Sequence, residues 1–248
     1  MLLSWAREDA EDFDSIAQAF FDTQPYEAFG EVDPDTGEVT QKIRILDPPS
    51  ELRKLAAHVL SDLKHALDQA AFAASAALLS RPPDTLYFPV ASHPNDLNAK
   101  LQNGAYPVEL HATFKALEPY PTGNGYSGGS DDFCALSKMA NTSKHVVAVS
   151  AVPRINLAGA RATASEMAGM RLIVDGWDAA KKELTVGISP KGANTKVNLQ
   201  IASFVAFDEV GPFEGESVGS VLEYFIGCVQ RSIDALEAAV AAALAARP

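Results

Sequence analysis

Five side chains of this sequence are of the types that build polar or catalytic centres: Asp62, His65, Asp68, Lys144 and His145. A histidine can act as a general acid or base near neutral pH, and a lysine beside it can hold an anion. Such a pair occurs where the segment Asn141-Thr142-Ser143-Lys144-His145 meets an apolar run. No pattern assigns a catalytic residue outright. If the chain is an enzyme, the best candidates are His145, Lys144, Asn141 and His65.

The same side chains also fit a structural role. A carboxylate at Asp68, inside an apolar helix pattern, is costly to bury without a cation, and Lys144 could neutralise it. Lys144 and His145 could also bind the last carbonyls of the helix before them. We favour this interpretation, in which a polar cluster joins a central helix to a sheet. Its predicted members are Asp62, His65, Asp68, Lys144 and His145.

A metal site is not predicted. His58, Asp62, His65 and Gln69 follow one flank of a helix at intervals of four, three and four. A carboxylate and a histidine three residues apart form half of a bundle metal site, but the sequence has no second such pair and no His-Glu-x-x-His. We therefore interpret the flank as a polar seam.

The glycine-rich segment 121–130 resembles two functional motifs without meeting their requirements. Residues 123–128 match the dinucleotide-binding pattern Gly-x-Gly-x-x-Gly, but no strand precedes them, and Asp131 and Asp132 would repel a phosphate at the next helix. Residues 125–129 match the Gly-x-Ser-x-Gly nucleophile elbow, but His145 is the one histidine downstream. We expect no cofactor.

Composition narrows the range of partners. The net charge is −12, and the longest basic runs are the pairs Arg53-Lys54 and Lys181-Lys182, so a nucleic acid partner is not expected. No apolar run approaches the roughly 20 residues that span a bilayer, so no membrane partner is expected.

Cys134 and Cys228 lie among apolar neighbours, which is typical of buried thiols. With no leader-like start, we expect a cytoplasmic protein, with homo-oligomerisation left open.

Hydrophobic spacing and turn residues predict the elements that must position these side chains. A helix over 4–21 precedes a hairpin of strands 26–32 and 39–46, closed by Asp33-Pro34-Asp35-Thr36-Gly37. A long helix, capped by Ser50, runs to Leu79. An extended stretch over 86–90 follows. Further helices are expected over 95–102, 108–117 and 131–141, strands over 146–155, 170–174, 183–188 and 197–207, and a last helix over 218–246.

Together these elements predict an α+β fold with an antiparallel sheet, a long buried central helix and a long C-terminal helix. We expect one domain over residues 1–248, with a hairpin and helical part at 1–143, a strand-rich part at 144–210 and a helix at 217–246.

The chain resembles a group of bacterial and phage proteins without established function. The residues that carry the resemblance are Leu63, Ala66-Leu67-Asp68, Phe88-Pro89, Pro119-Tyr120 and Asn141 with Lys144-His145. Asp62, Lys64, Gln69 and Val146 depart from the group's Asn, Arg, His and Arg. The resemblance covers most of the chain and implies a fold but no activity.

Asn141 and His145 also resemble part of the motif of helical HEPN-type ribonucleases, although Ala140 stands where their arginine would be. The preferred hypothesis is therefore a non-catalytic or ligand-binding protein. A ribonuclease or other hydrolase that uses Lys144 and His145 is the alternative.

Overall fold

The computed structural model describes residues 1–81, 83–123, 125–145, 151–156, 170–173, 177–178, 181–192, 202–207, 213 and 215–247. Its helices are α1 (Leu2–Asp22), α2 (Ser50–Leu78), α3 (Pro94–Gln102), α4 (Val108–Leu117), α5 (Asp131–His145) and α6 (Val218–Ala245). Its strands are β1 (Tyr26–Val32), β2 (Val39–Ile45), β3 (Ala151–Asn156), β4 (Arg171–Leu172), β5 (Trp177–Asp178), β6 (Glu183–Ser189) and β7 (Ala202–Phe207).

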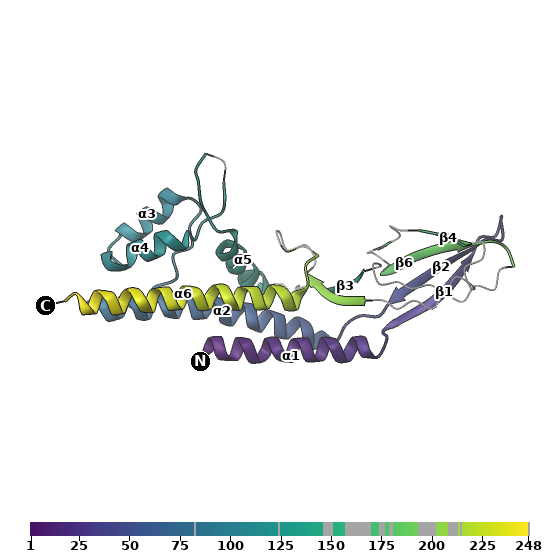
Figure 1. Ribbon diagram of the computed structural model, residues 1–248, viewed down its shortest axis with the longest axis horizontal. Coiled ribbons are helices and arrows are strands. Elements are labelled where there is room, and N and C mark those ends of the chain that lie inside the picture. The colour runs from purple at the N-terminus through teal and green to yellow at the C-terminus, as the bar shows by residue number, and fades with distance from the viewer. Residues whose placement is uncertain are drawn as a thin grey trace.

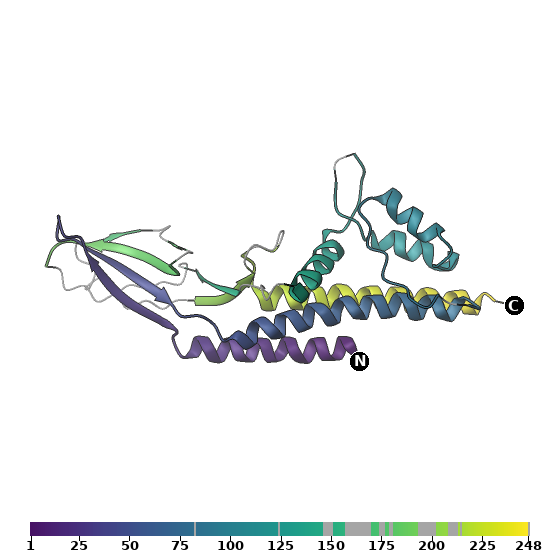
Figure 2. The ribbon, with the colours of Figure 1, turned by 180° about the vertical axis from the view of Figure 1, so that it is seen from behind.

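Three long helices form the body of the molecule. α2 and α6 lie side by side and run in the same direction, and α1 packs antiparallel against both (Figure 1). Their apolar stripes meet in one core, whose largest fully buried side chains include Phe13, Leu60, Leu63 and Phe225. Helices α3, α4 and α5 form a second layer on the side of α2 and α6 opposite α1 (Figure 2).

The strands lie beyond the end of the helical body at which α2 and α6 begin (Figure 1). The larger sheet has the order β1-β2-β6-β4, with β5 also paired to β6, and β3 pairs with β7. Each of these described pairings is antiparallel. The predicted α+β class, the antiparallel sheet and the long C-terminal helix are thus confirmed.

The hairpin forms where its turn residues predicted. Asp33 Oδ1 accepts the backbone N–H groups of Asp35 and Thr36, and Gly37 takes the left-handed φ of 73° that closes the turn. The prediction that Ser50 caps α2 is wrong. Pro49 occupies the cap position without a side-chain bond, since its extended ψ of 135° lets the helix begin at the next residue.

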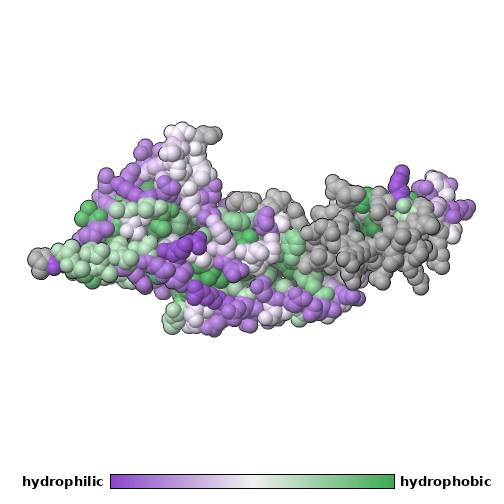
Figure 3. All heavy atoms as spheres, viewed as in Figure 1, coloured by the Kyte–Doolittle hydropathy of each residue, from purple (hydrophilic) through white to green (hydrophobic). Residues whose placement is uncertain are grey.

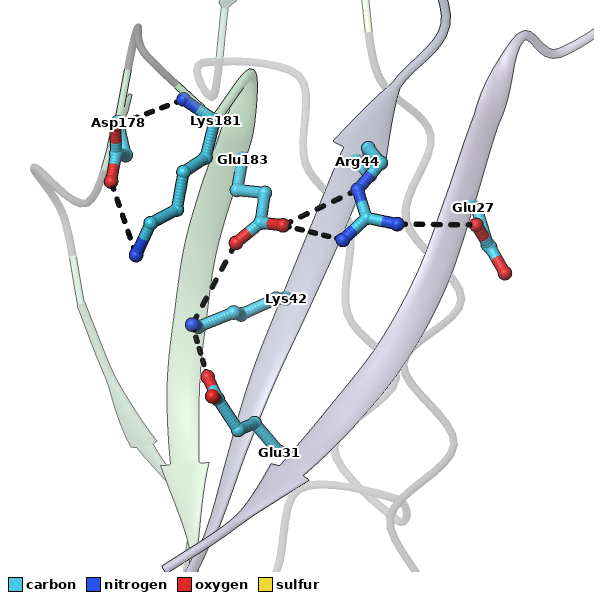
Figure 4. A network of polar contacts seen from close by, with 7 residues as sticks. All are labelled: Glu27, Glu31, Lys42, Arg44, Asp178, Lys181 and Glu183. Atoms are coloured by element: carbon cyan, nitrogen blue, oxygen red, sulfur yellow. Dashed lines mark hydrogen bonds and ion pairs between the residues drawn. The ribbon is translucent and has the colours of Figure 1, made fainter.

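One face of the larger sheet is apolar, with Ile43, Leu184 and Val186 buried. The other carries a network of ion pairs across three strands (Figure 4). The Glu183 carboxylate is nearly enclosed and lies 2.7 Å from an Arg44 guanidinium nitrogen and 3.7 Å from Lys42 Nζ. Two cations offset the cost of burying one carboxylate, which makes this network an architectural feature of the sheet.

The C-terminal part of α2 is less enclosed than its composition indicates. Its sequence from Ala66 to Leu79 is apolar nearly all round, which predicted passage through the middle of the fold. Leu67, Ala71 and Leu78 are indeed buried, but Phe72 is 36% exposed and Ala73 and Ala77 are exposed. An apolar face of α2 therefore lies open to solvent.

Candidate functional site

An extended segment, residues 84–90, lies against α2 and is held there by Asp68. Asp68 Oδ1 accepts the backbone N–H of Phe88 at 2.9 Å, and both carboxylate oxygens lie 2.6 Å from Lys64 Nζ. The Lys64 and Asp68 side chains retain only 14% and 15% of their exposure. At this depth a charge must be paired, so the lysine is what allows the carboxylate to hold the segment.

A second anchor for the segment comes from Tyr106. Its hydroxyl donates to the Tyr87 carbonyl at 2.7 Å. Burial, together with the nearby negative charge of Asp68, raises the pKa of Tyr106 to about 12. The phenol consequently keeps its proton, and its role as a donor, throughout the physiological pH range.

Residues that carry the resemblance to the bacterial and phage group meet around the segment 84–90. Asp68 bonds Phe88, the Ala91 N–H donates to the Pro119 carbonyl at 2.8 Å, and the Phe88 ring packs against Phe133 of α5 with ring centroids 5.1 Å apart. Segments that are far apart in sequence are thus joined around the extended segment 84–90. A structural role for these motif residues follows from their bonds.

The predicted polar cluster is only partly described. The cation beside Asp68 is Lys64, one turn earlier on the same helix, which the sequence reasoning missed although Lys and Asp four residues apart share a helix face. The side chains of Lys144 and His145 lie outside the described residues, so the pairing of Asp68 with Lys144 stays a prediction.

The other predicted members lie elsewhere or point outward. His65 is exposed on α2, and Asn141 is exposed on α5. Asp62 lies on the side of α2 that faces α1. The pKa of Asp9 on α1 is raised mainly by the burial of that carboxyl group, and the negative charge of Asp62 raises it further. His58 Nδ1 lies 4.0 Å from an Asp9 oxygen, so the polar seam predicted on α2 makes contact with α1.

No group of three or more histidine, cysteine, aspartate or glutamate side chains among the described residues could hold a metal ion. The two thiols are also unsuited to nucleophilic chemistry. Burial raises the pKa of Cys134 and of Cys228, which keeps both as neutral thiols at neutral pH.

The glycine-rich loop is held by its own side chains. Tyr126 donates to the Pro121 carbonyl at 2.7 Å, and the Thr122 N–H and hydroxyl both bond the Asp131 carboxylate at the start of α5. The first residue of α5, Asp131, therefore holds a negative charge beside this loop, where it would repel a phosphate. Ser127 is exposed.

Beside the extended segment lies a hollow of about 420 Å³, the size of a small-molecule site. Leu86, Phe88, Pro89, Val90 and Ala105 form its apolar wall. The polar side chains on its lining are Lys64, Thr85, Tyr87, Lys100, Asn103, Tyr106 and Ser137.

The polar lining is rich in donors. Among the described residues that line it, the charged side chains are two lysines and none is a carboxylate, in a chain of net charge −12. Lys100 Nζ donates to the Val90 carbonyl at 2.7 Å and lies 3.6 Å from Asp96, so each lysine is held by partners on one side. Within the described part of the chain, the Ser137 hydroxyl has no hydrogen-bond partner. An ammonium has three N–H donors, which leaves each lysine capacity for a ligand.

Fold and site together define an elongated α+β protein with a donor-lined hollow between α2, α3, α5 and the extended segment 84–90. Comparisons of the chain with protein-family models, with curated protein sequences and with solved structures found no match. None of the helices among the described residues has the length and hydropathy needed to cross a membrane.

Proposed function

We propose that the protein is a non-catalytic binding protein whose ligand is a small organic anion, a carboxylate or phosphate attached to an apolar group. The observation that carries the proposal is the hollow beside residues 84–90. Its charged lining consists of Lys64 and Lys100, while the carbonyls of Tyr87 and Val90 on its wall already accept bonds from protein donors.

The rigidity of the lining supports binding over catalysis. Lys64 is held by Asp68 and Lys100 by Val90, so these two donors need little reordering when a ligand arrives. None of these groups is paired in the way a nucleophile is paired with a base. The apolar wall would receive the remainder of the ligand, and Tyr87, which is 66% exposed, would cover it at the mouth of the hollow.

Calorimetric titration with phenyl phosphate tests the proposal, with phenol as the uncharged control and benzylamine as the cationic one. We expect phenyl phosphate alone to bind. Lys100→Gln should weaken binding about ten-fold or more, since a hydrogen bond to a charged group contributes roughly 1.5–3 kcal/mol. The matched control is Lys115→Gln on α4, where the lysine is exposed and does not line the hollow.

Equal binding of phenol and phenyl phosphate, or equal losses from Lys100→Gln and Lys115→Gln, would refute an anion site. Substitution of Lys64 is less informative, because it also removes the partner of Asp68 and so affects the fold. The ribonuclease alternative has its own assay: it requires the protein to cleave RNA, and His145→Ala to abolish that cleavage while preserving the helical circular dichroism.

A further inference from the structure

The segment 84–90 borders a second hollow, of about 530 Å³, which we call the Asp84 hollow. One of its walls is a face of α2, formed by Asp68, Gln69, Phe72 and Ala73. The other wall is formed by residues 84–87, and the volume suits a small molecule. The Asp84 hollow shares residues 85–87 with the hollow that contains Lys64 and Lys100, so the two lie on adjoining parts of one segment.

The two hollows carry opposite charges. Among the described residues that line the Asp84 hollow, the charged side chains are Asp68 and Asp84, and none is a lysine, arginine or histidine. Asp68 is neutralised, because both of its carboxylate oxygens lie 2.6 Å from Lys64 Nζ. Asp84 is exposed, and no cation among the described residues pairs with it. One uncompensated negative charge therefore lies at this hollow, in a chain whose net charge of −12 attracts cations.

Two aromatic side chains also line the Asp84 hollow. Phe72 is 36% exposed and Tyr87 is 66% exposed, so both rings are accessible to a ligand. The face of an aromatic ring attracts a cation, and quaternary ammonium ions are recognised in this way. The protein already binds one ammonium of its own by the same means: Lys64 Nζ lies 5.9 Å from the centroid of the Tyr87 ring and contacts Asp68, and both of these partners line the hollow.

The hollow differs from the nearby surface of α6. Hydrophobic residues cover the exposed C-terminal half of α6 in the space-filling view (Figure 3). The Asp84 hollow instead combines aromatic rings with a carboxylate, on a face of α2 about a third of a turn away from the face that meets α6. This combination favours a ligand that is both cationic and apolar.

We propose that the Asp84 hollow binds a small quaternary ammonium ion, whose charge is met by the Asp84 carboxylate and by the rings of Phe72 and Tyr87. A quaternary ammonium has no N–H donors, which suits a hollow where both Asp68 oxygens are already bonded to Lys64. A primary ammonium has three such donors. The remaining acceptors, on Gln69, Asp84 and Thr85, are exposed, so a primary ammonium gains little when it exchanges water for them.

Calorimetric titration with benzyltrimethylammonium chloride tests this proposal, with benzylamine as the control of equal charge that retains its N–H donors. We expect the quaternary ion to bind and benzylamine not to bind. Phe72→Leu keeps an apolar side chain but removes the ring, and it should weaken binding about five-fold or more. The matched control is Trp5→Leu on α1, because Trp5 is 47% exposed and does not line the hollow.

A second variant, Asp84→Asn, keeps the size of the side chain and removes its charge. It should weaken binding of benzyltrimethylammonium about three-fold in low-salt buffer, and the loss should shrink as salt is added. Asp12→Asn, at an exposed position of α1, is the control and should leave binding unchanged. Unchanged circular dichroism of each variant shows that the fold is intact.

The proposal is overturned if benzyltrimethylammonium gives no heat of binding at millimolar concentrations, or if benzylamine binds equally well. It is also overturned if Trp5→Leu weakens binding as much as Phe72→Leu does. The outcome is separate from that of the anion site. Lys100→Gln should leave binding of benzyltrimethylammonium intact, and Asp84→Asn should not weaken binding of phenyl phosphate, so either proposal can fail alone.

Discussion

Replacement of Asp68 by alanine removes the group that fastens the extended segment to α2. Two losses add in this variant. The Phe88 N–H is left without its acceptor at 2.9 Å, and the Lys64 ammonium, only 14% exposed, loses its counter-charge. Breaking a buried ion pair from one side costs about 3–5 kcal/mol, and we discount this for the residual exposure of both side chains. We therefore expect the free energy of unfolding to fall by about 3 kcal/mol.

The assay is urea unfolding followed by circular dichroism at 222 nm, with Asp96→Ala as the matched control. Asp96 also pairs with a lysine four residues away and accepts a backbone N–H, that of Ser92, but its side chain is 37% exposed. The control substitution should lower the free energy of unfolding by about 1 kcal/mol. The reasoning is refuted if Asp68→Ala costs less than about 1 kcal/mol or no more than the control.

A double-mutant cycle then identifies the cation that Asp68 uses. If Lys64 is the main partner, Lys64→Ala and Asp68→Ala should couple by about 1–3 kcal/mol. The same cycle with Lys144→Ala measures the pair that the sequence predicted. A coupling above about 1 kcal/mol there would show that Lys144 also neutralises Asp68.

Two further predictions concern the loop and the contact between α1 and α6. Gly129→Ala should destabilise the fold by about 1–3 kcal/mol in urea unfolding, because φ is +106° and a Cβ would lie 2.7 Å from a backbone oxygen; Gly125→Ala, where a Cβ meets nothing within 4 Å, should cost less. Burial and the negative charge of Glu223 raise the pKa of Asp14 above its ordinary 3.8. The folded state therefore binds a proton on Asp14 more readily than the unfolded state does. The stability that this difference contributes is lost as the pH rises through the folded-state pKa. Asp14→Asn should therefore raise the melting temperature at pH 7 but give no such gain near pH 3, and an equal gain at both pH values would contradict this cause.

The amino-acid sequence by itself determined the elements and the turns between them. Hairpin strands, the long helices and their approximate ends follow from local causes: apolar spacing along one face, Asp33 and Gly37 in a turn, and prolines that stop a helix or strand. Antiparallel pairing was also predicted, since connections such as that over residues 178–181 are too short for helical crossovers.

Only the tertiary structure decided what each apolar or charged face meets. Periodicity identifies the apolar face of α2 but cannot tell that α1 covers half of it and leaves Ala73 exposed. The sequence shows that a buried Asp68 needs a cation nearby, but a lysine on the same helix and a distant lysine meet that need equally well. In the structure the cation that contacts Asp68 is Lys64. The hollow also depends on the tertiary structure, because its lining combines Lys64 of α2 with the segment 85–90, Lys100 and Tyr106. Such contacts depend on how whole elements pack, and local sequence carries no record of that packing.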